Sequence, residues 1–391
     1  MEGLEKALEQ IKENMPGLEL REHEPMREHC SFKVGGPVRA FAVPRDIFEM
    51  SKVMFYLHMN GVSPLTLGKC TNVIIPEEGL DIMVISTESL RKLRLGETEN
   101  TVYAEAGVSL ARLAQFARDN GLAGLEFASG IPGSVGGGVL MNAGAYGGEM
   151  KDVIESVVVY YIPTQTLTEV KASDCGFEYR RSGFERVNCA IMGAVFKLTP
   201  DEPEAIGARM KEMNEKRTLS QPLDMPSAGS AFKRPVGGYA AALIDQCGLK
   251  GYTVGGAQIS TKHAGFAVNT GSATYDDVVA LLDHVRREVY DRTQITLEHR
   301  YCHIDKFGIL GLALRPDTRS LAVAQMVLQA GSVITLRYRC RRKVQPARTQ
   351  RYRFPYELQH TVLHGHRTVR AEIARPVTHQ APGRLDPRER L

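Results

Sequence analysis

The chain has no tryptophan, no two cysteines in a C-x-x-C spacing and no apolar run near the roughly 20 residues that a membrane-spanning helix needs. The seven cysteines are scattered and odd in number, which disfavours a disulfide framework and a zinc site, so we expect no metal. The first residues, MEGLEKALEQIKENM, predict an acidic amphipathic helix without the basic start and apolar core of a signal peptide. These absences predict a cytoplasmic protein with reduced thiols and no membrane span.

Charge is divided unevenly along the 391 residues. The formal net charge is only +4, yet the segment from Tyr301 to the end holds 15 Arg and 2 Lys against six acidic residues, while the first 300 residues are mildly acidic. Such a tail is typical of a basic arm for nucleic acid or an anionic membrane, or of a disordered extension. The body is long enough for two or three packed domains.

Hydrophobic periodicity predicts an α+β body. Asp46 and Ser109 are candidate caps for two amphipathic helices, and a change of composition at residues 199–201 predicts a domain boundary. The helices predicted after the N-terminal one lie at residues 46–61, 109–120, 202–217 and 276–291. The predicted strands lie at residues 38–43, 63–68, 82–85, 101–106, 155–161, 166–170, 190–198 and 294–298, the pair 155–161 and 166–170 forming a hairpin.

The most glycine-dense segment is residues 124–149, GLEFASGIPGSVGGGVLMNAGAYGGE. Glycine lets a backbone approach a ligand closely, and successive free N–H groups form an anion site suited to a pyrophosphate, to which the Ser134 hydroxyl can add a donor. A set of tight turns between strands explains the same composition. The spacing matches neither a Walker A loop nor a strand–GxGxxG–helix unit, so a Rossmann fold is disfavoured.

A second polar loop, residues 67–72 with the sequence LGKCTN, follows a predicted strand. Gly68 permits a turn, and Thr71 and Asn72 offer side-chain hydrogen bonds to a phosphate or a ribityl chain. An ordinary turn is the alternative.

Four separate segments, in order and with characteristic spacing, carry a family resemblance: IPGSVGGGVLMNAGAYGGE, FEYRRSGF, PSAGSAFKRP and GLKGYTVGGAQISTKHAGFAVN. They resemble the UDP-N-acetylenolpyruvoylglucosamine reductase family, in its shorter type. The resemblance runs from about Met26 to Glu298. It implies two α+β subdomains that bind FAD, of the vanillyl-alcohol-oxidase type, and a C-terminal α+β substrate domain. Mapped here, the N-terminal helical segment is 1–30, the FAD-binding domain 31–200, the substrate domain 201–298 and an atypical Arg-rich tail 299–391.

The resemblance also implies the reaction: reduction of the enolpyruvyl ether of UDP-N-acetylglucosamine to UDP-N-acetylmuramate, for peptidoglycan precursors, with FAD as cofactor and NADPH as hydride donor. The expected partners are therefore the UDP-sugar and NADPH, with no nucleic acid; nothing in the sequence indicates an oligomeric state.

The resemblance assigns roles to individual residues. Arg180 matches the catalytic arginine, whose guanidinium can hold a carboxylate and stabilise charge that builds on it, and Ser230 matches the proton donor. A surface arginine and a helix cap are the alternatives for these two. The residues expected at the substrate are Tyr179, Lys233 and His263, although Lys233 could serve in a plain salt bridge and His263 as a structural group. The residues expected to bind the cofactor are Gly68, Thr71, Asn72, Gly133, Ser134, Gly136, Gly137, Asn142 and Gly144.

One position departs from the family pattern. The resemblance implies a third catalytic group, a glutamate in a late L-E-P-E-V segment, but this chain reads Leu297-Glu298-His299-Arg300-Tyr301, with Arg300 at the expected glutamate. A shift of reading frame just after Glu298 would explain the lost pattern, the missing carboxylate and the basic tail together. On that hypothesis we expect flavin binding to survive better than turnover, and the closing strand of the fold is in doubt.

Three other functions stay open at this point. Another FAD-dependent oxidase or dehydrogenase of the same superfamily would share the flavin half of the chain. A nucleic-acid-binding protein would depend on the basic tail. A flavin-binding protein without catalytic activity would be explained by Arg300.

Overall fold

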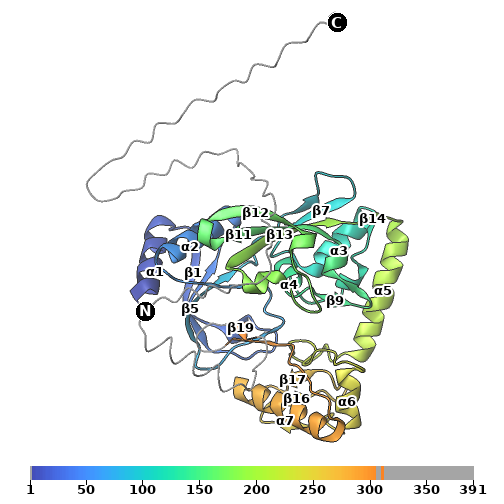
Figure 1. The fold of residues 1–391 in the computed structure, drawn as a ribbon. Helices are drawn as coiled ribbons and strands as arrows, with labels where there is room; N and C mark the ends of the chain where they lie inside the picture. The colour runs from blue at the N-terminus through green and yellow to red at the C-terminus, as the bar shows by residue number, and fades with distance from the viewer. Residues whose placement is uncertain (1, 305–309, 312–391) are drawn as a thin grey trace, which may run out of the picture. The chain divides into compact units, whose positions relative to one another are not determined.

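The computed structural model describes residues 2–304 and 310–311 of the chain (Figure 1). The predictions about the basic tail, residues 299–391, concern residues that almost all lie outside the described part of the chain. None of the described helices is long and apolar enough to cross a membrane.

The first sheet has the strand order β1-β2-β5-β3. Its strands are β1 (Glu19–Pro25), β2 (Pro37–Val43), β5 (Leu80–Ser86) and β3 (Leu65–Leu67), with β1 antiparallel to β2 and the other two pairs parallel. The helices α1 (Glu2–Asn14) and α2 (Ile47–Met59) share a hydrophobic core with β2 and β5, and Figure 1 shows them beside this sheet. Asp46 caps α2 as predicted, because its side chain accepts a hydrogen bond from the Glu49 N–H at 2.8 Å.

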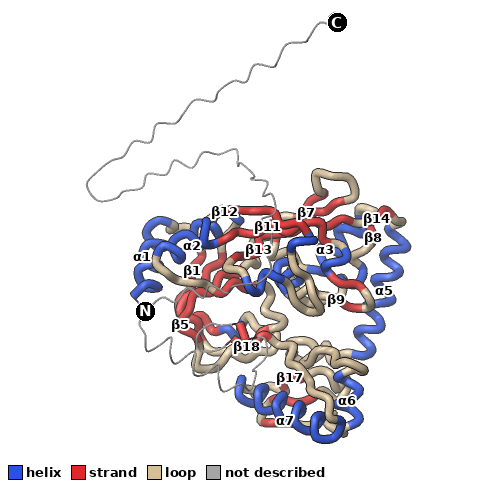
Figure 2. Tube along the Cα trace, in the orientation of Figure 1, coloured by secondary structure: helices blue, strands red, loops and turns tan. Residues whose placement is uncertain are grey.

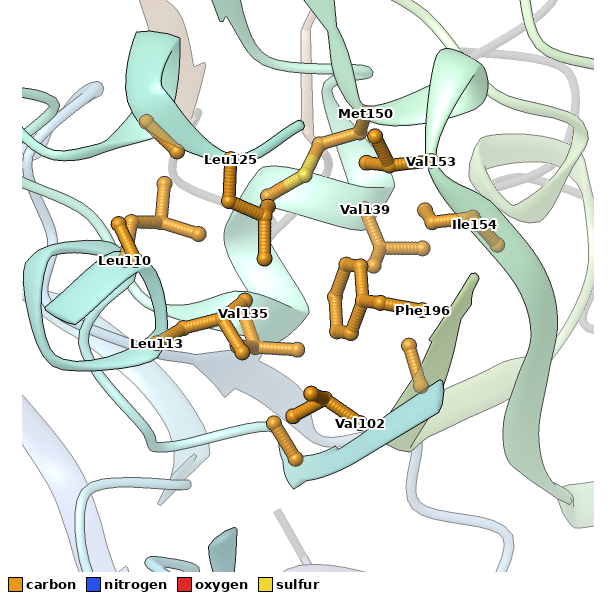
Figure 3. Packing of buried hydrophobic residues seen from close by; sticks show 14 of the residues in the cluster. Val102, Leu110, Leu113, Leu125, Val135, Val139, Met150, Val153, Ile154 and Phe196 are labelled. Atoms are coloured by element: carbon orange, nitrogen blue, oxygen red, sulfur yellow. The ribbon is translucent and has the colours of Figure 1, made fainter. Parts of the chain in front are cut away.

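The second sheet has the order β12-β11-β13-β7-β6 and is antiparallel throughout. Its strands are β12 (Thr166–Lys171), β11 (Ile154–Tyr161), β13 (Cys189–Lys197), β7 (Thr101–Glu105) and β6 (Leu93–Leu95). The predicted hairpin is therefore confirmed. Helix α3 (Leu110–Asp119), capped by Ser109, and helix α4 (Val135–Leu140) contribute apolar side chains to the core of this part. Figure 3 shows that core, with Val135 and Val139 of α4 close to Phe196 of β13.

Short antiparallel pairs complete this part of the fold. They are β8 (Leu122–Ala123) with β14 (Thr199–Pro200), and β9 (Gly144–Ala145) with β10 (Gly148–Glu149).

The C-terminal part consists of a small antiparallel sheet and two helices. The elements are β15 (Thr253–Val254), β16 (Ala257–Ile259), β17 (Ala267–Asn269), α6 (Ala240–Gln246) and α7 (Tyr275–Thr293), and Figure 2 shows β17 between the two helices. The long helix α5 (Pro203–Ser220) leads into it. Thr274 caps α7 in a reciprocal pair of hydrogen bonds with Asp277, and the apolar stripe of α7 is buried as predicted.

The chain returns to the first part after α7. Strand β18 (Cys302–Ile304) pairs in parallel with β4 (Val73–Ile74) and antiparallel with β19 (Leu310–Gly311). Tyr301 is fully buried and its hydroxyl donates to the Gly229 carbonyl at 3.0 Å. The closing strand that the reading-frame hypothesis put in doubt is therefore present in residues 302–304.

Two sequence expectations differ from the structure. The predicted strand 294–298 is wrong, because Gln294 adopts a left-handed φ of 59° as the cap of α7 and residues 294–298 lie in no strand. The chain begins to pair only at its end, where the Glu298 carbonyl accepts from the Lys233 N–H and His299 lies opposite Phe232. Strand β1 had no sequence signal, since its residues ELREHEP are polar on both faces and none of them is fully buried.

Candidate active site

The loop between β3 and β4 leaves a run of backbone N–H groups unpaired. Those of Gly68, Lys69, Cys70 and Thr71 donate no hydrogen bond to any residue that the structure describes. Cys70 has a left-handed φ of 47°, a conformation that can bring successive N–H groups to one side of a turn. Such a concave set of donors suits an anionic group such as a pyrophosphate.

Ser134 lies directly against this loop. A Cβ atom at Gly68 would come within 2.1 Å of the Ser134 Oγ atom, so a side chain there would force the Ser134 hydroxyl or the loop to move. The hydroxyl groups of Ser134 and Thr87 are buried, and neither has a hydrogen-bond partner among the described residues. Because buried hydroxyls normally have partners, these two fit a ligand that offers hydrogen-bonding groups at this point.

Two hollows of about 280 and 380 Å³ adjoin this contact and share the lining residues Gly68, Lys69 and Glu88. The smaller hollow includes Ser134 and Thr87, and the larger includes Thr71. An extended nucleotide cofactor therefore has adjoining space, unpaired backbone donors and unpaired hydroxyls, and we conclude that the residues present fit FAD.

Other residues predicted to bind the cofactor gather at the same contact. A Cβ atom at Gly133 would lie 3.9 Å from Thr71 Oγ1, so the two glycine-bearing loops meet. One at Gly137 would lie 3.7 Å from the Oγ atom of Ser134 in the same segment. Gly136 has a different reason to be glycine, because its Cβ would lie 2.9 Å from the Ala106 Cβ atom in the protein interior.

Asn72 is engaged elsewhere in the structure. Its side-chain amide donates to the Arg300 carbonyl at 3.3 Å and contacts Cys302 Sγ at 3.3 Å, while its own carbonyl accepts from the Cys302 N–H at 2.8 Å. Its hydrogen bonds thus hold the returning strand against the cofactor loop, and a role toward the cofactor stays a prediction.

Arg180 lies in a tight turn whose ends are joined by backbone hydrogen bonds between Glu178 and Arg181, at 3.0 and 3.2 Å. Arg180 itself has a φ of 58°, a costly conformation for a residue with a side chain. Its guanidinium lies over the Tyr179 ring, 5.1 Å from the centroid, and its Nε atom is buried without a partner. The turn therefore fixes the guanidinium and leaves a donor free.

Asn142 ties this turn to the glycine-rich segment. It is fully buried, and its amide donates to the Glu178 carbonyl at 2.9 Å and to the Glu149 carboxylate at 3.0 Å. In return, the Arg180 guanidinium donates to the Asn142 carbonyl at 3.2 Å and to the Gly144 carbonyl at 2.5 Å. A Cβ at Gly144 would lie 2.5 Å from the Gly148 carbonyl oxygen, 2.7 Å from the Glu149 Cβ atom and 3.0 Å from the guanidinium, so only glycine fits between them.

Ser230 lies in an extended segment between two others. Its backbone pairs with Phe266, and the next residue, Ala231, donates to the Gly265 carbonyl and accepts from the Arg300 N–H, at 2.8 and 2.9 Å. Ser230 is half-buried, and its hydroxyl has no hydrogen-bond partner among the described residues. The hydroxyl is therefore available to a ligand.

The Ser230 segment and the Arg180 turn are joined by polar contacts. The buried Lys233 ammonium lies 2.6 Å from the Glu298 carboxylate, which also accepts from Arg181 at 3.3 Å. The Tyr179 hydroxyl accepts a hydrogen bond from the Arg234 N–H at 3.4 Å. Lys233 thus makes the salt bridge that was the alternative to its substrate role.

Arg300 occupies the space beside this turn. Burial lowers the pKa of the Arg300 guanidinium to about 10, and repulsion from Arg180 and Arg217 contributes to the shift. The hydroxyls of Tyr179 and Tyr301 act in the opposite direction. Arg300 therefore stays charged near neutral pH within reach of Arg180. A carboxylate expected from the family pattern is replaced here by a cation.

His263 makes local contacts instead. Its Nδ1 accepts from the Gly265 N–H at 3.0 Å, its ring lies edge-on to Phe266 at 5.0 Å, and burial lowers its pKa. No other predicted site residue contacts its side chain in the part of the chain that the structure describes. The expected substrate contact stays a prediction.

Three residues near these sites had no assigned role in the sequence. Thr87 follows a predicted strand without any motif. Arg217 ends the predicted helix 202–217, where a polar helix gave no reason to single it out. Glu185 has a buried carboxylate oxygen without a partner among the described residues, and burial raises its pKa; only the fold reveals that burial.

The unpaired donors and the adjoining hollows at the β3–β4 loop indicate a nucleotide-cofactor site, and the family profiles define the class. Residues 38–170 match the family profile described as an FAD binding domain, so the class is that of FAD-binding oxidoreductases. Residues 221–302 match the profile described as the C-terminal domain of UDP-N-acetylenolpyruvoylglucosamine reductase.

Curated relatives extend the similarity over most of the chain. The UDP-N-acetylenolpyruvoylglucosamine reductase of Limosilactobacillus reuteri is 41% identical over 288 residues, covering 74% of this chain and 96% of the relative. That of a Thermotoga species is 43% identical over 284 residues, covering 72% and 92%. The crystal structure of the Thermus caldophilus enzyme superimposes with a TM-score of 0.62 at 32% identity, over 73% of this chain and 98% of that one.

The chain belongs to the UDP-N-acetylenolpyruvoylglucosamine reductase family. The predicted family and the predicted fold, an FAD-binding domain followed by a C-terminal α+β domain, are both confirmed.

Proposed function

We propose that this protein reduces the enolpyruvyl ether of UDP-N-acetylglucosamine to UDP-N-acetylmuramate, with FAD as cofactor and NADPH as hydride donor, in the synthesis of peptidoglycan precursors. The observation that carries the proposal is the similarity to curated reductases over 92–96% of their own length. The free Nε donor of Arg180 and the hydroxyl of Ser230, which has no partner among the described residues, support it.

Bound FAD supplies the two-electron chemistry, since it can accept a hydride from NADPH and pass one to the β-carbon of the alkene. The Arg180 guanidinium would hold the substrate carboxylate through charge-assisted hydrogen bonds. Negative charge builds on that carboxylate as an enolate when the β-carbon receives the hydride. A guanidinium already fixed by the Asn142 and Gly144 carbonyls can stabilise this charge without reorganising.

The Ser230 hydroxyl would deliver the proton to the α-carbon. Its unpaired state and half-buried position suit a group that must donate to substrate. Lys233, three residues further on, is held by Glu298 and would act by fixing the segment that carries Ser230. Tyr179, which lies next to Arg180 in the same turn and is half exposed, would contact the sugar nucleotide.

The partners of this reaction are the UDP-sugar and NADPH, and both are cytoplasmic compounds, which agrees with the expected cytoplasmic location. Nucleic acid has no part in the proposed function.

The test uses purified protein loaded with FAD. NADPH oxidation should depend on the enolpyruvyl sugar nucleotide and should yield UDP-N-acetylmuramate, detected by mass spectrometry. Arg180→Lys should lower kcat by about a hundredfold or more, and Ser230→Ala by about a hundredfold, the range typical of lost charge stabilisation or proton delivery. Peroxide formation with a sugar alcohol, without the UDP-sugar requirement, would instead identify an oxidase of the same superfamily.

A further inference from the structure

The loop between β3 and β4 has two ends with different surroundings. At its C-terminal end, the Asn72 amide donates to the Arg300 carbonyl at 3.3 Å, and the Arg300 N–H donates to the Ala231 carbonyl at 2.9 Å. This end therefore lies toward the segment that carries Ser230. At its N-terminal end, Gly68 lines the smaller hollow, of about 280 Å³, together with the loop after β5 and the start of α3.

Two buried residues give the smaller hollow unsatisfied hydrogen-bonding groups. Thr87 and Ser134 line it, and neither hydroxyl has a partner among the described residues. The loop after β5 is fastened to the start of α3, because the Gly107 N–H donates to the Leu90 carbonyl at 3.0 Å. A Cβ atom at Gly107 would lie 1.9 Å from the Thr87 carbonyl oxygen, so the two segments are in close contact. The lining is therefore preformed and fits a ligand with hydrogen-bonding groups of its own.

The charged residues that line the same hollow are three cations, Lys69, Arg91 and Arg112, and one carboxylate, Glu88. None of the four forms an ion pair with a residue that the structure describes, and the Arg91 guanidinium donates only to the Glu88 backbone carbonyl, at 2.6 Å. The N-terminus of the ten-residue helix α3 favours an anion at this hollow as well. Guanidinium groups bind phosphate oxygens, whereas a carboxylate only accepts hydrogen bonds, so the set suits a phosphate with hydroxyl groups beside it.

The two ends of the loop determine the direction of the cofactor. In FAD the pyrophosphate lies between the flavin half and the adenosine half. The proposed reaction needs the flavin beside Ser230, at the C-terminal end of the loop. With the pyrophosphate on the unpaired N–H groups of residues 68–71, the adenosine half extends past Gly68 into the smaller hollow.

We propose that the smaller hollow holds the adenosine monophosphate half of FAD and selects FAD over FMN, with Arg91 and Arg112 on the adenosine-side phosphate and Glu88 on the ribose hydroxyls. The assignment rests on the proposed function, because that function places the flavin at Ser230. None of these three residues is among those that the sequence predicted at the cofactor.

The test starts from FAD-loaded protein that is equilibrated with FMN at constant ionic strength, and the flavins still bound after gel filtration are quantified by chromatography. We expect the wild type to prefer FAD by about a hundredfold or more, from two charge-assisted interactions of about tenfold each. Arg91→Gln and Arg112→Gln should each lower this preference about tenfold and leave the affinity for FMN unchanged. Arg287→Gln, which changes an exposed arginine of α7, is the matched control and should keep the wild-type preference.

The sign of the effect of Glu88→Gln decides the role of that carboxylate. An acceptor of ribose hydroxyls weakens when its charge is removed, so the preference for FAD should fall by about threefold to tenfold. Tighter retention of FAD in this variant would show that Glu88 only repels the phosphate, and would overturn its assignment. Melting temperatures verify that each variant is folded.

Equal retention of FAD and FMN by the wild type, or an unchanged preference in both arginine variants, would overturn the proposal. ADP tests whether the hollow serves a free nucleotide instead. Binding of ADP to FAD-loaded protein, measured by calorimetry and lost in Arg112→Gln, would show that the hollow is open beside the bound cofactor and would also overturn it.

These measurements do not use turnover. A protein with the expected flavin preference that does not reduce the UDP-sugar would refute the proposed function alone. Reduction of the UDP-sugar by a protein without that preference would refute the assignment of the hollow alone.

Discussion

Asn142 and Arg180 hold each other in place: the Arg180 guanidinium donates to the Asn142 carbonyl, and the Asn142 amide donates to the carbonyl of Glu178, in the same turn as Arg180. Asn142 therefore orients the Arg180 guanidinium from a buried position and needs no contact with substrate. Replacement of Asn142 by alanine should lower kcat by about tenfold to a hundredfold, because the turn that holds Arg180 at its left-handed φ loses the hydrogen bond from the Asn142 amide to the Glu178 carbonyl. Steady-state kinetics on FAD-loaded protein measure this, with flavin content as the check that the cradle is intact.

The same substitution should reduce stability by about 2–3 kcal/mol, since it leaves buried partners of the amide unsatisfied. Urea unfolding measures the change. If the variant loses the predicted stability but its folded fraction keeps the wild-type kcat, Asn142 has no role in positioning Arg180.

Gly68→Ala should abolish or strongly weaken FAD binding. The added methyl group would lie 2.1 Å from Ser134 Oγ, so the loop or the serine has to move out of the cradle. Gly238→Ala is the matched control, because a Cβ there meets nothing within 4 Å. The ratio of flavin to protein absorbance after gel filtration gives the answer, and equal flavin retention in both variants would show that the Gly68 contact does not shape the cofactor site.

Ser134→Ala separates binding from folding. The hydroxyl has no partner among the described residues, so its removal should leave the free energy of unfolding of the flavin-free protein unchanged or slightly higher. The affinity for FAD should fall by about tenfold if the hydroxyl hydrogen-bonds the cofactor. Fluorescence titration of apoprotein with FAD measures the affinity; an unchanged dissociation constant would remove Ser134 from the cofactor site.

Arg300→Glu should raise kcat for the UDP-sugar by about tenfold or more, because it supplies the carboxylate that the family pattern has at this position and removes a charge that repels Arg180. Arg300→Gln tests the two effects separately, since it removes the cation without adding an acid. Turnover that rises equally in both variants would assign the whole gain to the removed charge.

Stability should fall as the pH is lowered from about 6.5 to about 4. His299 and His303 stack with centroids 5.5 Å apart, and their ring nitrogens have no hydrogen-bond partner among the described residues. Burial lowers the pKa of each imidazole to about 4, with Arg286 lowering that of His299 and the Asp283 carboxylate raising that of His303. Because the unfolded chain binds protons near pH 6.5 and the folded chain does not, each histidine costs about 3 kcal/mol of stability by pH 4.

Urea unfolding at several pH values measures this dependence. His303→Phe should flatten the slope between pH 6.5 and 4.5. The same slope in that variant and in the wild type would show that His303 does not contribute.

Local sequence patterns were sufficient for much of the fold. Asp46 and Ser109 cap the helices that their positions predicted, because a cap depends on residues within one turn. The glycine-bearing loops could be recognised from composition, but their contact, where a Cβ at Gly68 would lie 2.1 Å from Ser134 Oγ, joins segments far apart in the sequence and becomes visible only in the fold. The salt bridge from Lys233 to Glu298 was only one of two possibilities, because residues 65 positions apart become neighbours only in the folded chain.

What the sequence could not supply are burial and long-range pairing. Glu185 and Arg217 acquire their unusual surroundings from segments far away in the chain, and Asn72 is engaged by residues 228 and 230 positions later. Strand β1 is polar on both faces because it lies at the edge of its sheet, so its pairing with β2 is determined by the backbone rather than by an apolar stripe.

Strand β18 is joined to β4 by main-chain hydrogen bonds and by the Asn72 side-chain amide, while Cys302 and Ile304 are buried in the core beside it. The backbone hydrogen bonds of this pairing do not depend on the identity of an exposed side chain, whereas a site built from functional groups does. Arg300 contributes its backbone N–H and carbonyl to this junction, so the strand beside the cofactor loop forms although the Arg300 side chain departs from the family pattern.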